Sequence, residues 1–112
     1  MSKRVLVETR DLFFRGKIQE IVRASGSEIT RAEPCDLAVV ELGKADAQDR
    51  IRGLVERGVA VLAFGSHVNA EQLRDARTAG ARAVPNSEVE LALRAVGTLG
   101  RRAARELLRA RR

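Results

Sequence analysis

The feature that most constrains this sequence is a pair of short runs that are apolar at every position. Residues 37–40 read Leu-Ala-Val-Val, and residues 59–64 read Val-Ala-Val-Leu-Ala-Phe. Successive residues of a strand point to opposite faces of a sheet, so these runs predict strands that are buried on both faces. Two shorter runs, at residues 5–7 and 83–84, are also apolar, and the second precedes Pro85, as is typical of an edge strand.

Amphipathic segments separate the apolar runs. A stripe of apolar residues with helical spacing begins near Asp11 and stops at Gly26, and shorter stripes precede Gly58 and Gly80 and follow Ser87. This alternation predicts an α/β fold in which a doubly wound parallel sheet lies between two layers of helices. We expect one domain over residues 1–98, followed by a helical extension over residues 99–112.

The second strand–helix unit of this pattern is incomplete. Only residues 32–35 separate a candidate strand at 28–31 from the strand that begins at Asp36-Leu37. A parallel crossover usually needs about a dozen residues, most often a helix. We therefore expect four good strands and at most a short fifth strand at 28–31 with an irregular return; the alternative is that this strand and its helix are absent.

The positive charge of the chain is concentrated at its C-terminus. The formal net charge is +6, but residues 101–112 contain six Arg and one Glu, so residues 1–100 carry only +1. An apolar stripe through Leu99, Ala103 and Leu107 predicts a basic amphipathic helix. Its arginines could contact nucleic-acid phosphates, an anionic membrane surface, an acidic partner or a second copy, or its stripe could simply cover the domain. The candidate contact residues are Arg101, Arg102, Arg105, Arg109, Arg111 and Arg112.

Several classes of function are disfavoured by what the sequence contains. No apolar run approaches the ~20 residues of a membrane span, and the N-terminus lacks a secretory signal pattern. One cysteine cannot form a disulfide within the chain, and one cysteine with one histidine cannot form a Cys/His zinc site. We expect Cys35 to be an inert small side chain and His67 a turn residue. The interpretation is a cytoplasmic domain without a metal, a cofactor or catalytic residues.

Residues 4–97 resemble the receiver domains of bacterial two-component response regulators. The resemblance begins in the first strand and helix. Cys35–Glu41 is similar to the receiver pattern Pro-Asp-Leu-Val-Leu-Leu-Asp. The segment AEQLRDARTAGARAV is similar to the fourth helix and fifth strand of receivers. The pieces Leu12-Phe13-Phe14 and Phe64-Gly65-Ser66-His67-Val68 further resemble small stand-alone receiver-like bacterial proteins without an output domain. The resemblance implies a flavodoxin-like, receiver-like fold.

The same resemblance implies that the phosphorylation site is degenerate. Receivers use an Asp acceptor, an acidic pair that holds Mg²⁺ with it, a Lys and a Ser or Thr. Here the acceptor position is Glu41, and the acidic-pair positions are Thr9 and Arg10, flanked by two acids. The Ser/Thr position falls on Phe64 or Gly65, with Ser66 just beyond it, and the Lys position falls on Ser87. The degenerate phosphoacceptor site therefore comprises Thr9, Arg10, Asp11, Glu41, Ser66 and Ser87.

These departures indicate a pseudo-receiver, a non-catalytic and unphosphorylated signalling or adaptor protein that acts through protein–protein contacts. We hypothesise that Arg10 pairs with Glu41 as a fixed cation where receivers hold Mg²⁺; the alternative is that both are solvated strand-end residues. The implied partner and homodimer face is formed by the helix at 69–79, the strand at 83–84 and the helix after Ser87. The alternative function is a small nucleic-acid-associated protein that uses the Arg-rich C-terminal helix.

Overall fold

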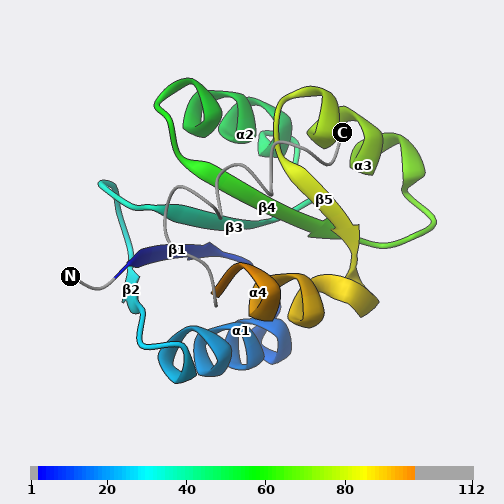
Figure 1. Cartoon of the computed structure of the whole chain (residues 1–112). Helices are drawn as coiled ribbons and strands as arrows, with labels where there is room; N and C mark the ends of the chain where they lie inside the picture. The colour runs from blue at the N-terminus through cyan, green and yellow to red at the C-terminus, as the bar shows by residue number, and fades with distance from the viewer. Residues whose placement is uncertain (1–2, 98–112) are drawn as a thin grey trace.

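The computed structural model describes residues 3–97 and contains a five-stranded parallel sheet covered by helices on both faces. The strand order is β2-β1-β3-β4-β5, with α1 and α4 on one face and α2 and α3 on the other (Figure 1). This confirms the predicted α/β fold, and the extension expected at residues 99–112 lies outside the described residues. The elements are β1 (Arg4–Glu8), α1 (Leu12–Ala24), β2 (Glu28–Thr30), β3 (Leu37–Glu41), α2 (Ala47–Glu56), β4 (Ala60–Gly65), α3 (Ala70–Thr78), β5 (Arg82–Pro85), the short 3₁₀ helix η1 (Asn86–Glu88) and α4 (Val89–Gly97).

The sheet separates two apolar cores, as expected from the fully apolar runs. In β3 and β4 the side chains alternate, so that Val39 and Leu62 pack against α1 and α4 while Ala38 and Val61 pack against α2 and α3. All of these side chains are buried. Because both faces of the central strands are apolar, neither face can be left to water, and each needs a helical layer.

The strand β2 is short, and its shortness explains why no helix follows it. Thr30 ends β2 level with Leu6 of β1, while Leu37 begins β3 level with Val5. Residues 31–36 therefore move back by one residue, about 3.3 Å, while crossing two strand spacings, about 10 Å. An extended chain of that length covers this distance, since each residue spans up to about 3.3–3.6 Å. The short fifth strand with an irregular return is confirmed.

Polar side chains occupy the corner of the sheet that lacks a helix. On the α2/α3 side, β1 presents Arg4 and Glu8, and β2 presents Thr30, whose hydroxyl accepts from the Arg4 guanidinium at 2.7 Å. The Arg50 guanidinium of α2 donates to both Glu8 carboxylate oxygens at 2.7–3.1 Å. The 31–36 connection adds Glu33, which lies 3.6 Å from Arg50.

A second arginine of the α2 region completes this arrangement. The Arg57 guanidinium donates to the two Glu33 carboxylate oxygens at 2.8 and 2.9 Å. We call Glu8, Glu33, Arg50 and Arg57 the corner network. The hydrogen bond from Arg57 lowers the pKa of Glu33 below its ordinary value. Because the pKa of Glu33 is lower in the folded state, its ion pair with Arg57 stabilises the fold at neutral pH. This stabilisation is lost as the pH falls through the folded-state pKa of Glu33.

Replacing Arg50 with Gln should remove the link between β1, the 31–36 connection and α2. We expect the free energy of unfolding to fall by about 1 kcal/mol, because the pair is bidentate but roughly a third exposed and therefore partly screened. Urea unfolding at neutral pH measures this change. The control Arg52→Gln removes an exposed i,i+3 pair with Asp49 and should cost less than about 0.5 kcal/mol; equal losses in the two variants would contradict a structural role of the corner network.

Candidate functional site

Glu41 ends β3 at the carboxyl edge of the sheet, and its side chain is tied to the loop after β1. One carboxylate oxygen, Oε1, accepts from the Thr9 hydroxyl at 2.7 Å and from the Arg10 backbone N–H at 3.0 Å. Thr9 is buried, and its hydroxyl oxygen also accepts from the Asp11 backbone N–H at 3.2 Å. We call Thr9, Arg10, Asp11 and Glu41 the carboxyl-edge site. Its hydrogen bonds hold the Glu41 carboxylate in one position.

The structure corrects the hypothesis of an Arg10–Glu41 ion pair. Arg10 reaches Glu41 through its backbone N–H, and among the described ion pairs none involves its guanidinium. The reason is the direction of consecutive side chains: Thr9 is turned into the protein, and Arg10, the next residue, is exposed. The Glu41 carboxylate is therefore held by a hydroxyl and an amide rather than by a cation.

The two acids beside Thr9 and Arg10 are both engaged elsewhere. Glu8 points to the opposite face of the sheet and binds Arg50. Asp11 is the N-cap of α1, where its Oδ1 accepts from the backbone N–H groups of Phe13 at 2.9 Å and Phe14 at 3.2 Å.

These residues do not fit a magnesium site. Mg²⁺ requires several oxygen ligands in near-octahedral geometry, and here the nearby carboxylates are used in an ion pair, a helix cap and the Thr9–Glu41 contact. Within residues 3–97, no group of three or more His, Cys, Asp or Glu side chains is placed to hold a metal ion. Arg10 adds a positive charge to the same loop.

Apolar side chains flank Glu41 across the sheet. Glu41 is paired in register with Phe64 of β4, and Phe64 is paired with Val84 of β5. The Phe64 ring is fully buried and lies 5.5 Å from the Phe14 ring, centroid to centroid. A side chain at Gly65 would meet Leu42, since an added Cβ comes within 3.1 Å of the Leu42 Cβ. On the β4 side, the residue in register with Glu41 is therefore a buried aromatic one, while the β1 side supplies the Thr9 hydroxyl.

The two serines of the predicted site follow the same strands but do not join it. Ser66 accepts from the Val68 backbone N–H at 3.4 Å, and Ser87 is exposed in η1, beyond the end of β5. Among the described hydrogen bonds, neither reaches Glu41. His67 is also exposed here. Cys35 lies at the other end of the sheet, where burial is the main cause of the raised pKa of its thiol, so the neutral form is favoured.

Large apolar side chains are exposed in the segments that follow β1, β4 and β5, a feature that the sequence did not predict. Four large hydrophobic residues of the described chain are 65–77% exposed, and each lies in a loop or first helical turn that follows a strand. We call them the edge patch: Leu12, Phe13, Val68 and Leu91. Leu12 and Phe13 lie outside the stripe of α1 residues that is buried. Apolar residues off this stripe were the sequence signal that could have predicted the exposed side chains.

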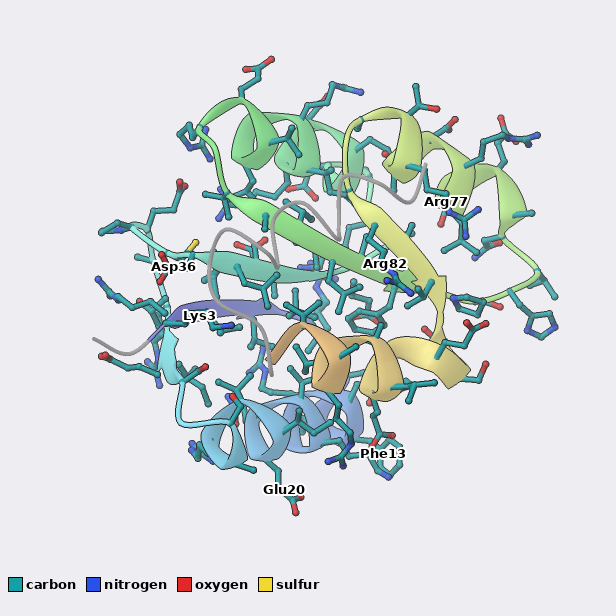
Figure 2. The ribbon with its side chains drawn as sticks, in the orientation of Figure 1. Lys3, Phe13, Glu20, Asp36, Arg77 and Arg82 are labelled. Atoms are coloured by element: carbon teal, nitrogen blue, oxygen red, sulfur yellow. The ribbon has the colours of Figure 1, made fainter. Side chains whose placement is uncertain are left out.

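Phe13 illustrates how the patch is held. Figure 2 shows its side chain projecting away from the body of the protein. The Lys17 ammonium lies 4.9 Å from the centre of the Phe13 ring and 3.7 Å from the Glu90 carboxylate. This arrangement connects α1 to α4 beside the exposed ring.

Solved structures with a similar fold include a receiver domain and two response regulators. The BeF3-activated DrrB receiver domain has a TM-score of 0.72 and 16% identity, and the match covers 85% of this chain and 93% of that one. A response regulator from Thermotoga maritima has a TM-score of 0.73 and 15% identity, with 95% and 99% covered. HP1043, an orphan response regulator of H. pylori, has a TM-score of 0.67 and 19% identity, with 93% and 96% covered.

These likenesses show that the chain has the receiver fold, which confirms the resemblance seen in the sequence. No protein-family model and no curated protein matches the sequence. Within the described residues, the helices are too short or too polar to cross a membrane.

Replacing Thr9 with Val should release the Glu41 carboxylate. The change keeps the shape of the side chain but removes the hydroxyl, so that Glu41 loses a donor and the Asp11 N–H loses its acceptor. We expect a loss of about 1–3 kcal/mol in the free energy of unfolding, measured by urea titration. The matched control is Thr78→Val on α3, whose hydroxyl only bonds back to the Arg74 carbonyl and which is exposed. A Thr9→Val effect no larger than that of the control would show that the contact with Glu41 contributes no stability.

Proposed function

We propose that this protein is a pseudo-receiver, a signalling or adaptor protein that acts through protein contacts without phosphorylation and without catalysis. The observation that carries the proposal is the Glu41 carboxylate, whose Oε1 is held by the Thr9 hydroxyl and the Arg10 amide. Phosphoryl transfer requires a carboxylate that can attack and nearby cations that neutralise the developing charge. Here the carboxylate is restrained by these two donors, and its partner in register on β4 is the apolar Phe64.

A carboxyl edge without this chemistry can still present a recognition surface. Exposed large apolar side chains often mark protein contacts, and those of the edge patch lie in segments that follow the carboxyl ends of β1, β4 and β5. The restrained Glu41 supports a surface with one shape. We propose that a partner protein binds the edge patch and does so without a phosphorylation signal.

The face formed by α3, β5 and α4 is a second proposed contact surface, suited to a homodimer. Arg77 of α3 donates two guanidinium hydrogen bonds, at 2.8 and 3.2 Å, to the Ala83 carbonyl of β5. Figure 2 shows Arg77 on α3 and Arg82 on the neighbouring β5. These contacts fix the helix to the edge strand, and Leu91 of α4 adds an exposed apolar group.

Incubation with acetyl phosphate and Mg²⁺ tests the loss of phosphorylation. We expect the intact mass of the protein to remain unchanged, while a receiver domain treated in parallel gains a phosphoryl group. A stable acyl phosphate on Glu41 would overturn the pseudo-receiver proposal. The triple variant Thr9→Asp/Arg10→Asp/Glu41→Asp places three carboxylates at this edge and should bind Mg²⁺ more tightly than the wild type in a calorimetric titration.

The alternative function, association with nucleic acid, rests on the charge of residues 101–112. Six arginines and one glutamate in that segment give a charge of +5, which favours contact with phosphates. The segment lies outside the described residues. Association with nucleic acid is the second candidate because the positive charge is concentrated in residues 101–112, while residues 1–100 carry only +1.

Purification from the native cells with two variants distinguishes these functions. If the edge patch recognises a protein, Phe13→Ser/Leu91→Ser should lose the co-purified partner, while deletion of residues 101–112 should retain it. The matched control Glu20→Ser/Arg23→Ser changes two exposed residues of α1 outside both proposed surfaces and should also retain it. Recovery of nucleic acid that is lost with the tail, and that fades steeply between two salt concentrations, would favour the alternative.

A further inference from the structure

A cleft of about 450 Å³ lies where β2 stops short beside β1. The pairing of β1 with β2 ends at Leu6 and Thr30, whereas its pairing with β3 continues to Glu8. The sheet is therefore one strand narrower at this end, and the cleft occupies the resulting notch. Its volume falls within the range of about 300–1,000 Å³ that is common for small-molecule sites. Its lining comprises Leu6, Val7, Glu8, Arg15, Gln19, Ile29, Thr30 and Arg31.

The charged groups of the cleft favour an anion. Arg15 of α1 and Arg31 after β2 bring two guanidinium groups, and the one carboxylate in the lining, Glu8, is already bound by Arg50 from outside the cleft. Arg31 is exposed and forms no ion pair with a described residue. Two guanidinium groups without an acidic partner are well suited to carboxylate or phosphate oxygens.

The uncharged part of the lining limits the shape of that anion. Val7 and Ile29, which are half-buried on the α1 side of the sheet, supply aliphatic surface, and Gln19 supplies an amide that can donate or accept. A purely inorganic ion would leave the aliphatic wall in contact with water. A small anion with a short apolar body would cover the wall while its charged end meets the arginines.

The cleft is also connected to the carboxyl-edge site. The Arg15 guanidinium donates a hydrogen bond to the Thr9 carbonyl, and the Thr9 hydroxyl donates to Glu41. Arg15 therefore lies between the two sites. An anion that draws on the remaining donors of Arg15 would act on the same loop that holds Glu41.

We propose that the notch beside β2 is a binding site for a small organic anion, a carboxylate or phosphate ester with a short aliphatic body, with Arg15 and Arg31 as its anion-binding residues. The site is distinct from the edge patch and does not depend on whether Glu41 is phosphorylated. Through Arg15, occupancy of this site would be sensed at Thr9.

Titrations followed by amide NMR spectra of the full chain test the proposal. The probes are butyrate, butylamine and butanol, which share a short aliphatic body, together with inorganic phosphate. We expect butyrate to cause saturable shifts in the amides of Leu6, Ile29 and Arg31, with a further shift at Thr9, and butylamine and butanol to cause none. Saturation by phosphate with an affinity equal to that of butyrate would contradict the role of the aliphatic wall.

Paired charge variants distinguish a specific binding site from nonspecific electrostatic attraction. Arg15→Gln/Arg31→Gln should weaken butyrate binding roughly tenfold or more, since two charge-assisted contacts are lost. Arg23→Gln/Arg74→Gln removes the same charge at exposed positions outside the cleft and should leave the affinity unchanged. The single variant Arg31→Gln should weaken binding without disturbing the Arg15–Thr9 contact. The proposal fails if no anion saturates these amides, if Arg31→Gln binds like the wild type, or if both double variants weaken binding equally.

Discussion

Burial of β3 and β4 on both faces is the constraint on which the other features of this fold depend. Neither face of these strands can be exposed to water, so helices must pack on each side of the sheet. Because the helices connect parallel strands, the carboxyl ends of the strands lie at one edge of the sheet, and there the Thr9 hydroxyl contacts Glu41. Polar and exposed side chains are found where the sheet is less buried, at β2 and in the loops of the carboxyl edge. The unusual features of the molecule are found in these two places.

The acids at the carboxyl edge of this receiver fold are all engaged in structural contacts. Carboxylates that could meet a cation are present, yet Glu8 faces the other side of the sheet, Asp11 caps α1, and Glu41 bonds to Thr9 and Arg10. Each acid has acquired a structural partner. These structural roles support the proposal that the protein signals by contact and not by phosphoryl transfer.

Much of the fold could be predicted from the hydrophobic pattern, because short runs that are apolar at every position indicate strands with helices on both faces of the sheet. The missing helix after β2 was predicted from the short spacing to β3, but the corner network was not, although Arg4 and Glu8 on either side of Leu6 indicated a polar face of β1. The site was predicted in part. The Thr9–Glu41 contact, the Phe64–Val84 row beside it and the backbone role of Arg10 depend on register and side-chain direction, which residue spacing does not provide.

The corner network has a consequence for the response of the protein to temperature. Where a helix would cover the end strands with apolar surface, this chain uses Glu8, Glu33, Arg50 and Arg57. Less apolar surface is then exposed on unfolding, which lowers the heat capacity change and flattens the curve of free energy against temperature. The desolvation cost of ion pairs also falls as temperature rises. The end of the sheet that has no helix between β2 and β3 is therefore the part whose stability should decline least on warming.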